Sequence, residues 1–214
     1  NSAKGNIYGL ADSRSSDGVS PAVDNWLEII NLESTTKTFI VNIYDRTGKI
    51  KLKNKKVYVP PMGEVDMAGG HQFGKGAYLL EIIPPSLSTR YMASIARYST
   101  TDGLNNNYAT TVDFRKATGE SIFVPVSNES GGCYKSKNLV DIANTLNETV
   151  TAQIRYRSGS GSLIQPIKTV SLQPHSQTQI NASAIISGIG SIEISSTKPN
   201  SLLIQSSVYY SDCN

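Results

Sequence analysis

An internal repeat is the feature that most constrains what this chain can fold into. The segment WLEIINLESTTKTFIVNIYD at 26–45 is matched by LVDIANTLNETVTAQIRY at 139–156, and the match sets Asn31 against Asn144. Each copy is an alternating apolar segment, an Asn, a polar turn and a second alternating segment, which is the pattern of a β-hairpin. One hairpin is therefore encoded twice.

The match continues downstream at a nearly constant spacing, which indicates that a whole domain is duplicated. It aligns VYVPPMGEVDM (57–67) with VSLQPHSQTQI (170–180), YLLEI (78–82) with GSIEI (190–194), and ASIARYSTTD (93–102) with QSSVYYSD (205–212). A chain of 214 residues is long enough for two domains of about a hundred residues each. We predict a first repeat at 1–103, a linker or edge strand at 104–119, and a second repeat at 120–214.

Each copy predicts seven short strands separated by turn signals, with no stripe of helical period. The predicted fold class is all-β, with two tandem β-sandwich domains of the immunoglobulin-like kind. Period-two alternation predicts that Ile29 and Ile142 face inward, as do Ile43 and Ile154. Glu81 and Glu193, at equivalent strand positions, are predicted to face solvent.

The composition argues against only two kinds of partner, nucleic acid and the membrane interior. The chain has 20 Lys and Arg against 17 Asp and Glu, a formal net charge of +3, which is too small an excess to predict nucleic-acid binding. No apolar run approaches the roughly 20 residues of a membrane helix, so we expect no membrane insertion of this fragment. The first residues lack the basic and apolar regions of a signal peptide.

The repeat resembles the immunoglobulin-like or fibronectin-III-like β-sandwich modules that occur in tandem in exported bacterial surface proteins. The resemblance lies in IFVPV (122–126), NTLNETVTAQIRY (144–156), VSLQPHSQTQI (170–180) and SIEISSTKPNSLLIQSSVYYSD (191–212). It implies a spacer, adhesive or assembly module of a surface protein. Antibody-type domains pair two cysteines around a buried Trp, and Trp26 has no such cysteines in its own copy.

The two cysteines, Cys133 and Cys213, both belong to the second copy. In immunoglobulin-like topology the first strand can lie beside the last, which places both cysteines at one end of the sandwich. The resemblance therefore implies a Cys133–Cys213 disulfide, and a disulfide implies an oxidising, extracellular or periplasmic location. Two cysteines without a histidine at ligand spacing do not make a zinc site.

A lysine-rich segment, KIKLKNKK, is the most unusual local feature. Alternation on a strand would put Lys49, Lys51, Lys53 and Lys55 on one face, with Lys56 next to them. One interpretation is a cationic ridge for an anionic polymer such as a glycan, teichoic acid, lipopolysaccharide or nucleic acid. The other is an edge strand that its lysines protect from pairing with a second sheet.

Catalysis needs a convergent nucleophile, base and orienting group, and the sequence shows none. His71 lies in a Gly-rich turn, and His175 follows Pro174. Both histidines are predicted to be exposed loop residues. We predict no enzyme activity, no cofactor and no metal.

The expected function is therefore that of a secreted, non-catalytic adhesion or assembly module at the cell surface, with a protein or a glycan as its partner. A carbohydrate-binding module is the alternative, and a secreted hydrolase is a more distant one. A glycan array would separate the first two possibilities.

Overall fold

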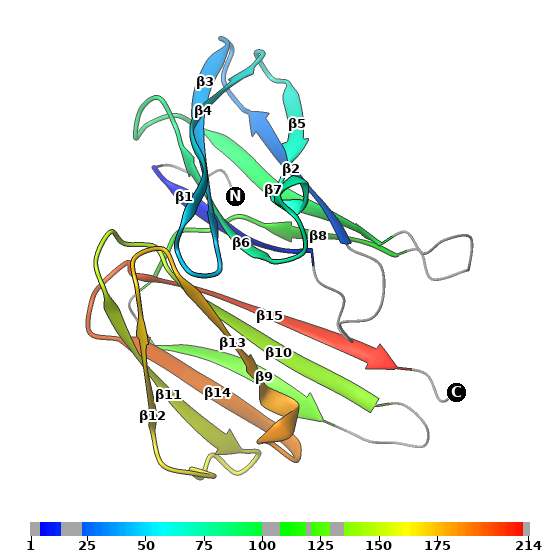
Figure 1. The fold of residues 1–214 in the computed structure, drawn as a ribbon, viewed down its shortest axis with the longest axis vertical. Coiled ribbons are helices and arrows are strands. Elements are labelled where there is room, and N and C mark those ends of the chain that lie inside the picture. The colour runs from blue at the N-terminus through cyan, green and yellow to red at the C-terminus, as the bar shows by residue number, and fades with distance from the viewer. Residues whose placement is uncertain (1–4, 14–22, 100–107, 119–120, 129–134, 212–214) are drawn as a thin grey trace. The chain divides into compact units, whose positions relative to one another are not determined.

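The structure is a computed structural model that describes residues 5–13, 23–99, 108–118, 121–128 and 135–211. It divides into two compact units, Asn1–Lys116 and Ala117–Asn214, and each is described by itself (Figure 1). All of the sheet pairings between strands are antiparallel, so the predicted all-β class is confirmed. The helical segments among the described residues are two short 3₁₀ turns, His71–Phe73 and Ala182–Ala184.

The first unit consists of two four-stranded sheets. One sheet has the order β1-β6-β3-β4, formed by β1 (Ile7–Asp12), β6 (Ala77–Ile83), β3 (Lys37–Asp45) and β4 (Ile50–Val59). The other has the order β5-β2-β7-β8, formed by β5 (Glu64–Ala68), β2 (Val23–Asn31), β7 (Tyr91–Ser99) and β8 (Tyr108–Asp113). Buried side chains from both sheets, among them Leu27 and Leu80, form one core, which is the arrangement of a β-sandwich.

The second unit repeats this strand order. Its four-stranded sheet has the order β9-β14-β11-β12, formed by β9 (Ile122–Asn128), β14 (Gly188–Ser196), β11 (Val150–Ser158) and β12 (Lys168–Leu172). Its three-stranded sheet has the order β13-β10-β15, formed by β13 (Gln177–Asn181), β10 (Lys135–Asn144) and β15 (Leu202–Ser211). Strand for strand, the order is that of the first unit without a counterpart of β8, and the second unit also has its own core.

The alternation in the sequence sets which side chains reach these cores. In β11 the buried positions are every second residue, Val150, Ala152, Ile154 and Tyr156. Ile29, Ile142, Ile43 and Ile154 are all fully buried, as predicted. The register corrects one equivalence, however. Asn42 pairs with Glu81 and Arg155 pairs with Glu193, so the counterpart of Ile43 is Tyr156.

A buried asparagine closes the same corner of each unit. Asn31 is fully buried at the end of β2, and its Nδ2 donates to the carbonyls of Thr35 (2.8 Å), Val59 (3.2 Å) and Pro60 (2.9 Å). The Oδ1 of Asn31 accepts from the backbone N–H of Glu33 at 3.0 Å. One side chain thus ties together the end of β2, the turn that follows it and the end of β4, which belongs to the opposite sheet.

Asn144 makes the same four bonds in the second unit. Its Nδ2 donates to the carbonyls of Glu148 (2.7 Å), Leu172 (3.1 Å) and Gln173 (3.0 Å), and its Oδ1 accepts from Leu146 N–H at 2.9 Å. Asn144 is also fully buried. We call this arrangement of Asn31 or Asn144 with its four partners the asparagine clamp.

The turn beside each clamp contains a left-handed residue that is not glycine. Met62 has φ 50° and His175 has φ 54°, a conformation that costs free energy for a side chain with a Cβ. The N–H of Met62 donates to Glu33 O at 3.1 Å, and the N–H of His175 donates to Leu146 O at 3.3 Å. Glu33 and Leu146 donate their N–H groups to the clamp asparagines. The carbonyls of the same two residues therefore also hold these turns.

The segment between the repeats contributes to the first unit. Strand β8 pairs with β7, and Arg115 N donates to Tyr8 O at 3.0 Å. Phe114 then packs over Gly9, where a Cβ would lie 2.5 Å from the Phe114 ring. A side chain at position 9 would displace that ring, so glycine is needed where the segment crosses β1.

The clamps predict matched losses of stability. Asn31→Ala leaves three carbonyls and one N–H without their partner, so we expect the first unit to lose about 2–4 kcal/mol of unfolding free energy. The single Trp of the chain, Trp26, lies on β2, so fluorescence-monitored denaturation follows this unit. Asn144→Ala is expected to leave the Trp26 fluorescence transition unchanged. It should destabilise the second unit, whose unfolding is monitored by circular dichroism.

The control is Thr36→Ala, because Thr36 is exposed in the turn that follows Asn31. It is expected to change stability by less than about 0.5 kcal/mol. A loss from Asn31→Ala no larger than that of Thr36→Ala would contradict a structural role for the clamp.

Candidate functional site

The lysine-rich segment forms most of β4, an edge strand of its sheet. Lys49, Lys51, Lys53, Lys55 and Lys56 are all exposed. The edge position agrees with the interpretation that lysines protect an unpaired strand. Exposure also leaves their ammonium groups accessible to an anionic partner.

The register of β4 divides these lysines between two faces. Val41 pairs with Lys55 and Ile43 pairs with Leu52, with an irregularity between the two pairs. Val41 and Ile43 both point into the core, so Lys55 lies on the face of Leu52. Lys51 and Lys53 flank Leu52 in the sequence and therefore point to the other face, as does Lys56 beside Lys55.

The residue responsible for this irregularity is Asn54. It has φ 54°, and its N–H donates to Asn42 Oδ1 at 2.8 Å instead of to a strand carbonyl. A bulge of this kind reverses the alternation of the residues beyond it. The single row of four lysines expected from the sequence is thereby replaced by a face that carries Lys51, Lys53 and Lys56.

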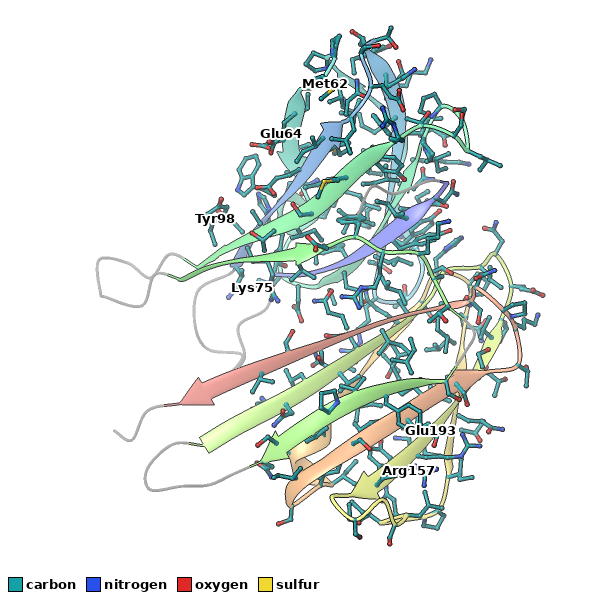
Figure 2. The ribbon with its side chains drawn as sticks, turned by 180° about the vertical axis from the view of Figure 1, so that it is seen from behind. Met62, Glu64, Lys75, Tyr98, Arg157 and Glu193 are labelled. Carbon is teal, nitrogen blue, oxygen red and sulfur yellow. The ribbon has the colours of Figure 1, made fainter. Side chains whose placement is uncertain are left out.

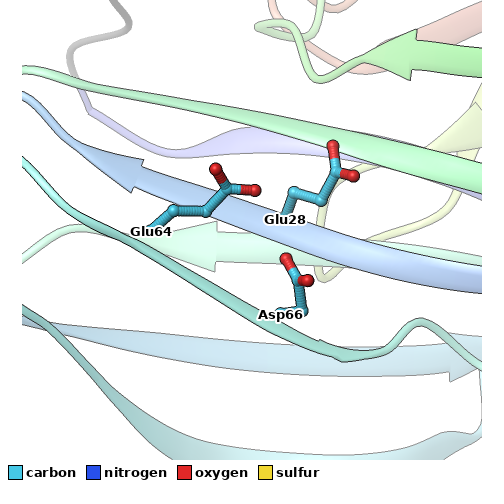
Figure 3. A group of neighbouring side chains, drawn as sticks. All are labelled: Glu28, Glu64 and Asp66. Carbon is cyan, nitrogen blue, oxygen red and sulfur yellow. The ribbon is translucent and has the colours of Figure 1, made fainter.

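Three carboxylates gather on the first unit where β2 pairs with β5 (Figure 3). Oxygens of Glu28, Glu64 and Asp66 all lie within 4.8 Å of one another, and Glu28 is directly opposite Asp66. Burial raises the pKa of Glu64, and the charges of Asp66 and Glu28 raise that pKa further. Oxygen ligands of this kind suit Ca²⁺ or Mg²⁺, although exposed acidic groups commonly gather without an ion.

No local pattern in the sequence predicts this carboxylate cluster. Glu28 and Asp66 belong to different strands, and only the pairing of β2 with β5 brings them together. Such pairing is a long-range property that alternation within one strand does not contain.

Because Glu64 lies in the carboxylate cluster, we predict that Glu64→Gln increases the stability of the first unit by an amount that depends on pH. Because the pKa of Glu64 is raised in the folded state, its contribution is favourable at low pH and is lost as the pH rises through that pKa. Removing the charge should therefore stabilise the first unit at pH 7 by about 0.2–1 kcal/mol, the usual size of a cross-strand charge effect, and by less at pH 4.

Trp26 fluorescence during urea denaturation at the two pH values measures this difference. Glu33→Gln serves as the control, because the pKa of Glu33 is lowered, first by the Arg90 backbone N–H, so the change should destabilise. Equal effects of Glu64→Gln at both pH values would contradict the proposed repulsion.

Glu81 is buried, not solvent-facing as its place in the alternation predicted. It accepts hydrogen bonds from Asn6 Nδ2 (3.2 Å), Tyr8 OH (3.3 Å), Asn42 Nδ2 (2.9 Å) and Tyr44 OH (3.4 Å). Burial together with the Glu81 charge raises the pKa of Tyr8 to about 12 and also raises that of Tyr44. Neutral donors from Asn6, β1 and β3 thus replace water around this carboxylate.

Glu193, at the equivalent position, has two arginines in place of those neutral donors. Its oxygens lie 3.2 Å from Arg155 Nη1 and 2.7 Å from Arg157 Nη2, and Figure 2 shows Arg157 beside Glu193. Glu193 lies on the outer face of its sheet, between the buried Ile192 and Ile194, as the alternation predicted, but its side chain is only 12% exposed. In both units the carboxylate is bound by its neighbours on the sheet, and neither is presented as a free acid or base.

The two histidines also have structural partners. His175 is only 7% exposed, contrary to the exposed loop position predicted for it, and its Nε2 lies 2.7 Å from Asn147 Oδ1. His71 is partly buried, with its Nδ1 3.0 Å from Asn25 N and 2.7 Å from Asn25 O. They lie in different units.

Both cysteines, Cys133 and Cys213, lie outside the described residues. The strands that lead to them are described, and they correct the topology expected from the resemblance. The first strand of the second unit, β9, pairs with β14, whereas the last strand, β15, pairs with β10. The expected neighbourhood of first and last strands in one sheet is therefore absent from the described part of this unit.

Comparisons with known proteins assign no family. No family profile matches this sequence, and no curated protein matches it. Among solved structures, the chain is similar to those of infectious bursal disease virus Gx and Gt strains, each at 12% identity with TM-scores of 0.20 and 0.16. The matches cover 99% and 97% of this chain but only 58% and 57% of those chains.

TM-scores of this size do not establish a shared fold. Among the residues that the structure describes, no helix has the length and apolar character needed to cross a membrane.

Proposed function

We propose that this chain is a non-catalytic pair of immunoglobulin-like β-sandwich modules, related by duplication, in an exported surface protein. The observation that carries the proposal is the recurrence of one strand order and one asparagine clamp in two units, each with its own core. Self-contained modules in tandem suit a spacer, an adhesin or an assembly subunit, in which reach and stability matter more than chemistry.

The polar residues that could have served catalysis support a non-catalytic role. His175 is bonded to Asn147, and Glu81 and Glu193 are occupied by donors on neighbouring strands. A general base must be within hydrogen-bond reach of a nucleophile or a substrate. Each of these groups instead contributes to the packing of its own unit.

An adhesion assay tests the proposed role. Beads coated with the chain are applied to cells pretreated with protease or with periodate, which oxidises surface sugars. We expect retention that protease treatment removes and periodate spares. The reverse pattern favours the carbohydrate-binding alternative, and absence of retention in every condition contradicts an adhesive function. Turnover of ester, peptide or glycoside substrates would contradict the non-catalytic assignment.

The proposed exported location rests on the Cys133–Cys213 disulfide that the resemblance implies, because disulfides form and persist in oxidising compartments.

If the pairing implied by the resemblance forms, non-reducing peptide mapping of protein made under oxidising conditions recovers a Cys133–Cys213 cross-link. Reduction should lower the stability of the second unit by roughly 4 kcal/mol on the loop-entropy account and leave the Trp26 transition unchanged. Free thiols at both positions would contradict the pairing and would remove the main support for an oxidising compartment.

A further inference from the structure

The first unit contains a small cavity with a cationic lining. Its volume is about 320 Å³, and it lies between the β3–β4 turn and the start of β6. The turn contributes Arg46, and Lys51 follows on β4, while Lys75 comes from the segment before β6. Figure 2 labels Lys75 on this unit. Ligand sites in proteins usually begin at about 300 Å³, so the cavity can hold one small group.

The cationic side chains of this cavity are available for a ligand. Arg46, Lys51 and Lys75 are all exposed, and none of them forms an ion pair with the described residues. A lining that holds three cations and one carboxylate is suited to an anion.

The one acid in the lining, Asp45, is occupied by its own turn. Its Oδ1 accepts from Thr47 N–H (2.9 Å), Thr47 Oγ1 (2.7 Å) and Lys49 N–H (3.1 Å). These bonds hold the tight β3–β4 turn that presents Arg46. Asp45 thus shapes the cavity, and the three cations leave it with a net positive charge.

The position of Lys51 extends the cavity into a track. Lys51 lines the cavity and also begins the face of β4 that carries Lys53 and Lys56. Lys51 and Lys53 are two apart on the strand, a spacing of about 7 Å, and Lys56 follows on the same face beyond the bulge at Asn54. Successive acidic groups of one polymer can therefore meet successive lysines. A ligand that enters the cavity through one group can therefore continue along the edge strand.

Sugar rings suit this track better than nucleotide bases. Proteins that bind single-stranded nucleic acid stack several bases on aromatic side chains. The exposed aromatic side chain of β4 is Tyr58, near the far end of the strand from the cavity. At the cavity itself Tyr78 is almost fully buried, with its hydroxyl donating to Gly74 O at 2.9 Å.

We propose that this cavity binds an acidic group of an anionic polysaccharide whose chain continues along Lys53 and Lys56. The proposal goes beyond the adhesive role proposed above, because it adds a polysaccharide site on the first unit to the protein partner that the adhesion assay detects. The carboxylate of a uronic acid and a sulfate ester share the chemistry required, since both are compact oxyanions that accept hydrogen bonds from guanidinium and ammonium groups.

Calorimetric titration of the intact chain with heparin, polygalacturonate, dextran and oligothymidine tests the proposal. We expect binding to heparin or polygalacturonate that weakens as salt is added, no binding to dextran, and weaker binding to oligothymidine. Heparin alone would assign the cavity to sulfate, and polygalacturonate alone would assign it to carboxylate. Failure of both acidic polysaccharides, or tighter binding of oligothymidine, would overturn the proposal.

Matched variants separate the cavity from general cationic attraction. Arg46→Ser/Lys75→Ser removes two cavity cations that are not on β4, and Lys55→Ser/Lys168→Ser removes two exposed lysines, one on the opposite face of β4 and one in the second unit. We expect at least about a tenfold loss of affinity for the first pair, as for two lost charge-assisted contacts, and less than about twofold for the second.

Equal losses in the two pairs would overturn the cavity as the site, since net charge alone would then explain the binding. All four positions are exposed, and an unchanged Trp26 unfolding transition shows that the first unit is intact in each variant. If no polysaccharide binds while adhesion of the beads stays protease-sensitive, the inference fails and the proposed function stands.

Discussion

The asparagine clamp is the interaction on which each unit depends. A sandwich of two sheets has no ladder hydrogen bonds between its layers, so its corners need other connections. Asn31 and Asn144 provide one such connection, since each lies at the end of a strand of one sheet and binds carbonyls at the end of a strand of the other. Burial makes the bonds important, because a carbonyl that loses its donor there has no water to replace it.

The part of the structure that the sequence predicted is the part with a local signal. Alternation within single strands predicted the all-β class and the burial of Ile29, Ile142, Ile43 and Ile154, because side-chain period and strand geometry coincide. The repeat also aligns Asn31 with Asn144 in the sequence. The hydrogen bonds themselves could not be predicted, since their partners on β4 and β12 lie about 28 residues away.

The errors have one physical origin, which is the register between strands. Alternation alone placed Glu81 in solvent, whereas neighbouring strands surround it with donors. The bulge at Asn54 depends on an acceptor from β3 and moves Lys55 to the other face. The alternation within single strands does not predict the cationic cavity either, because Lys75 joins Arg46 and Lys51 only through the pairing of β3 with β6.

Hydrogen exchange of the clamp amides tests the central claim most directly. In ¹⁵N-labelled protein transferred to D₂O, the side-chain NH₂ protons of Asn31 and Asn144 should persist, because all of their donors are buried and bonded. The exposed side chains of Asn54 and Asn200 provide the reference for free exchange. Persistence of both clamp signals after the reference signals have gone is the predicted result. Exchange of Asn31 and Asn144 at the rate of Asn54 and Asn200 would contradict the account.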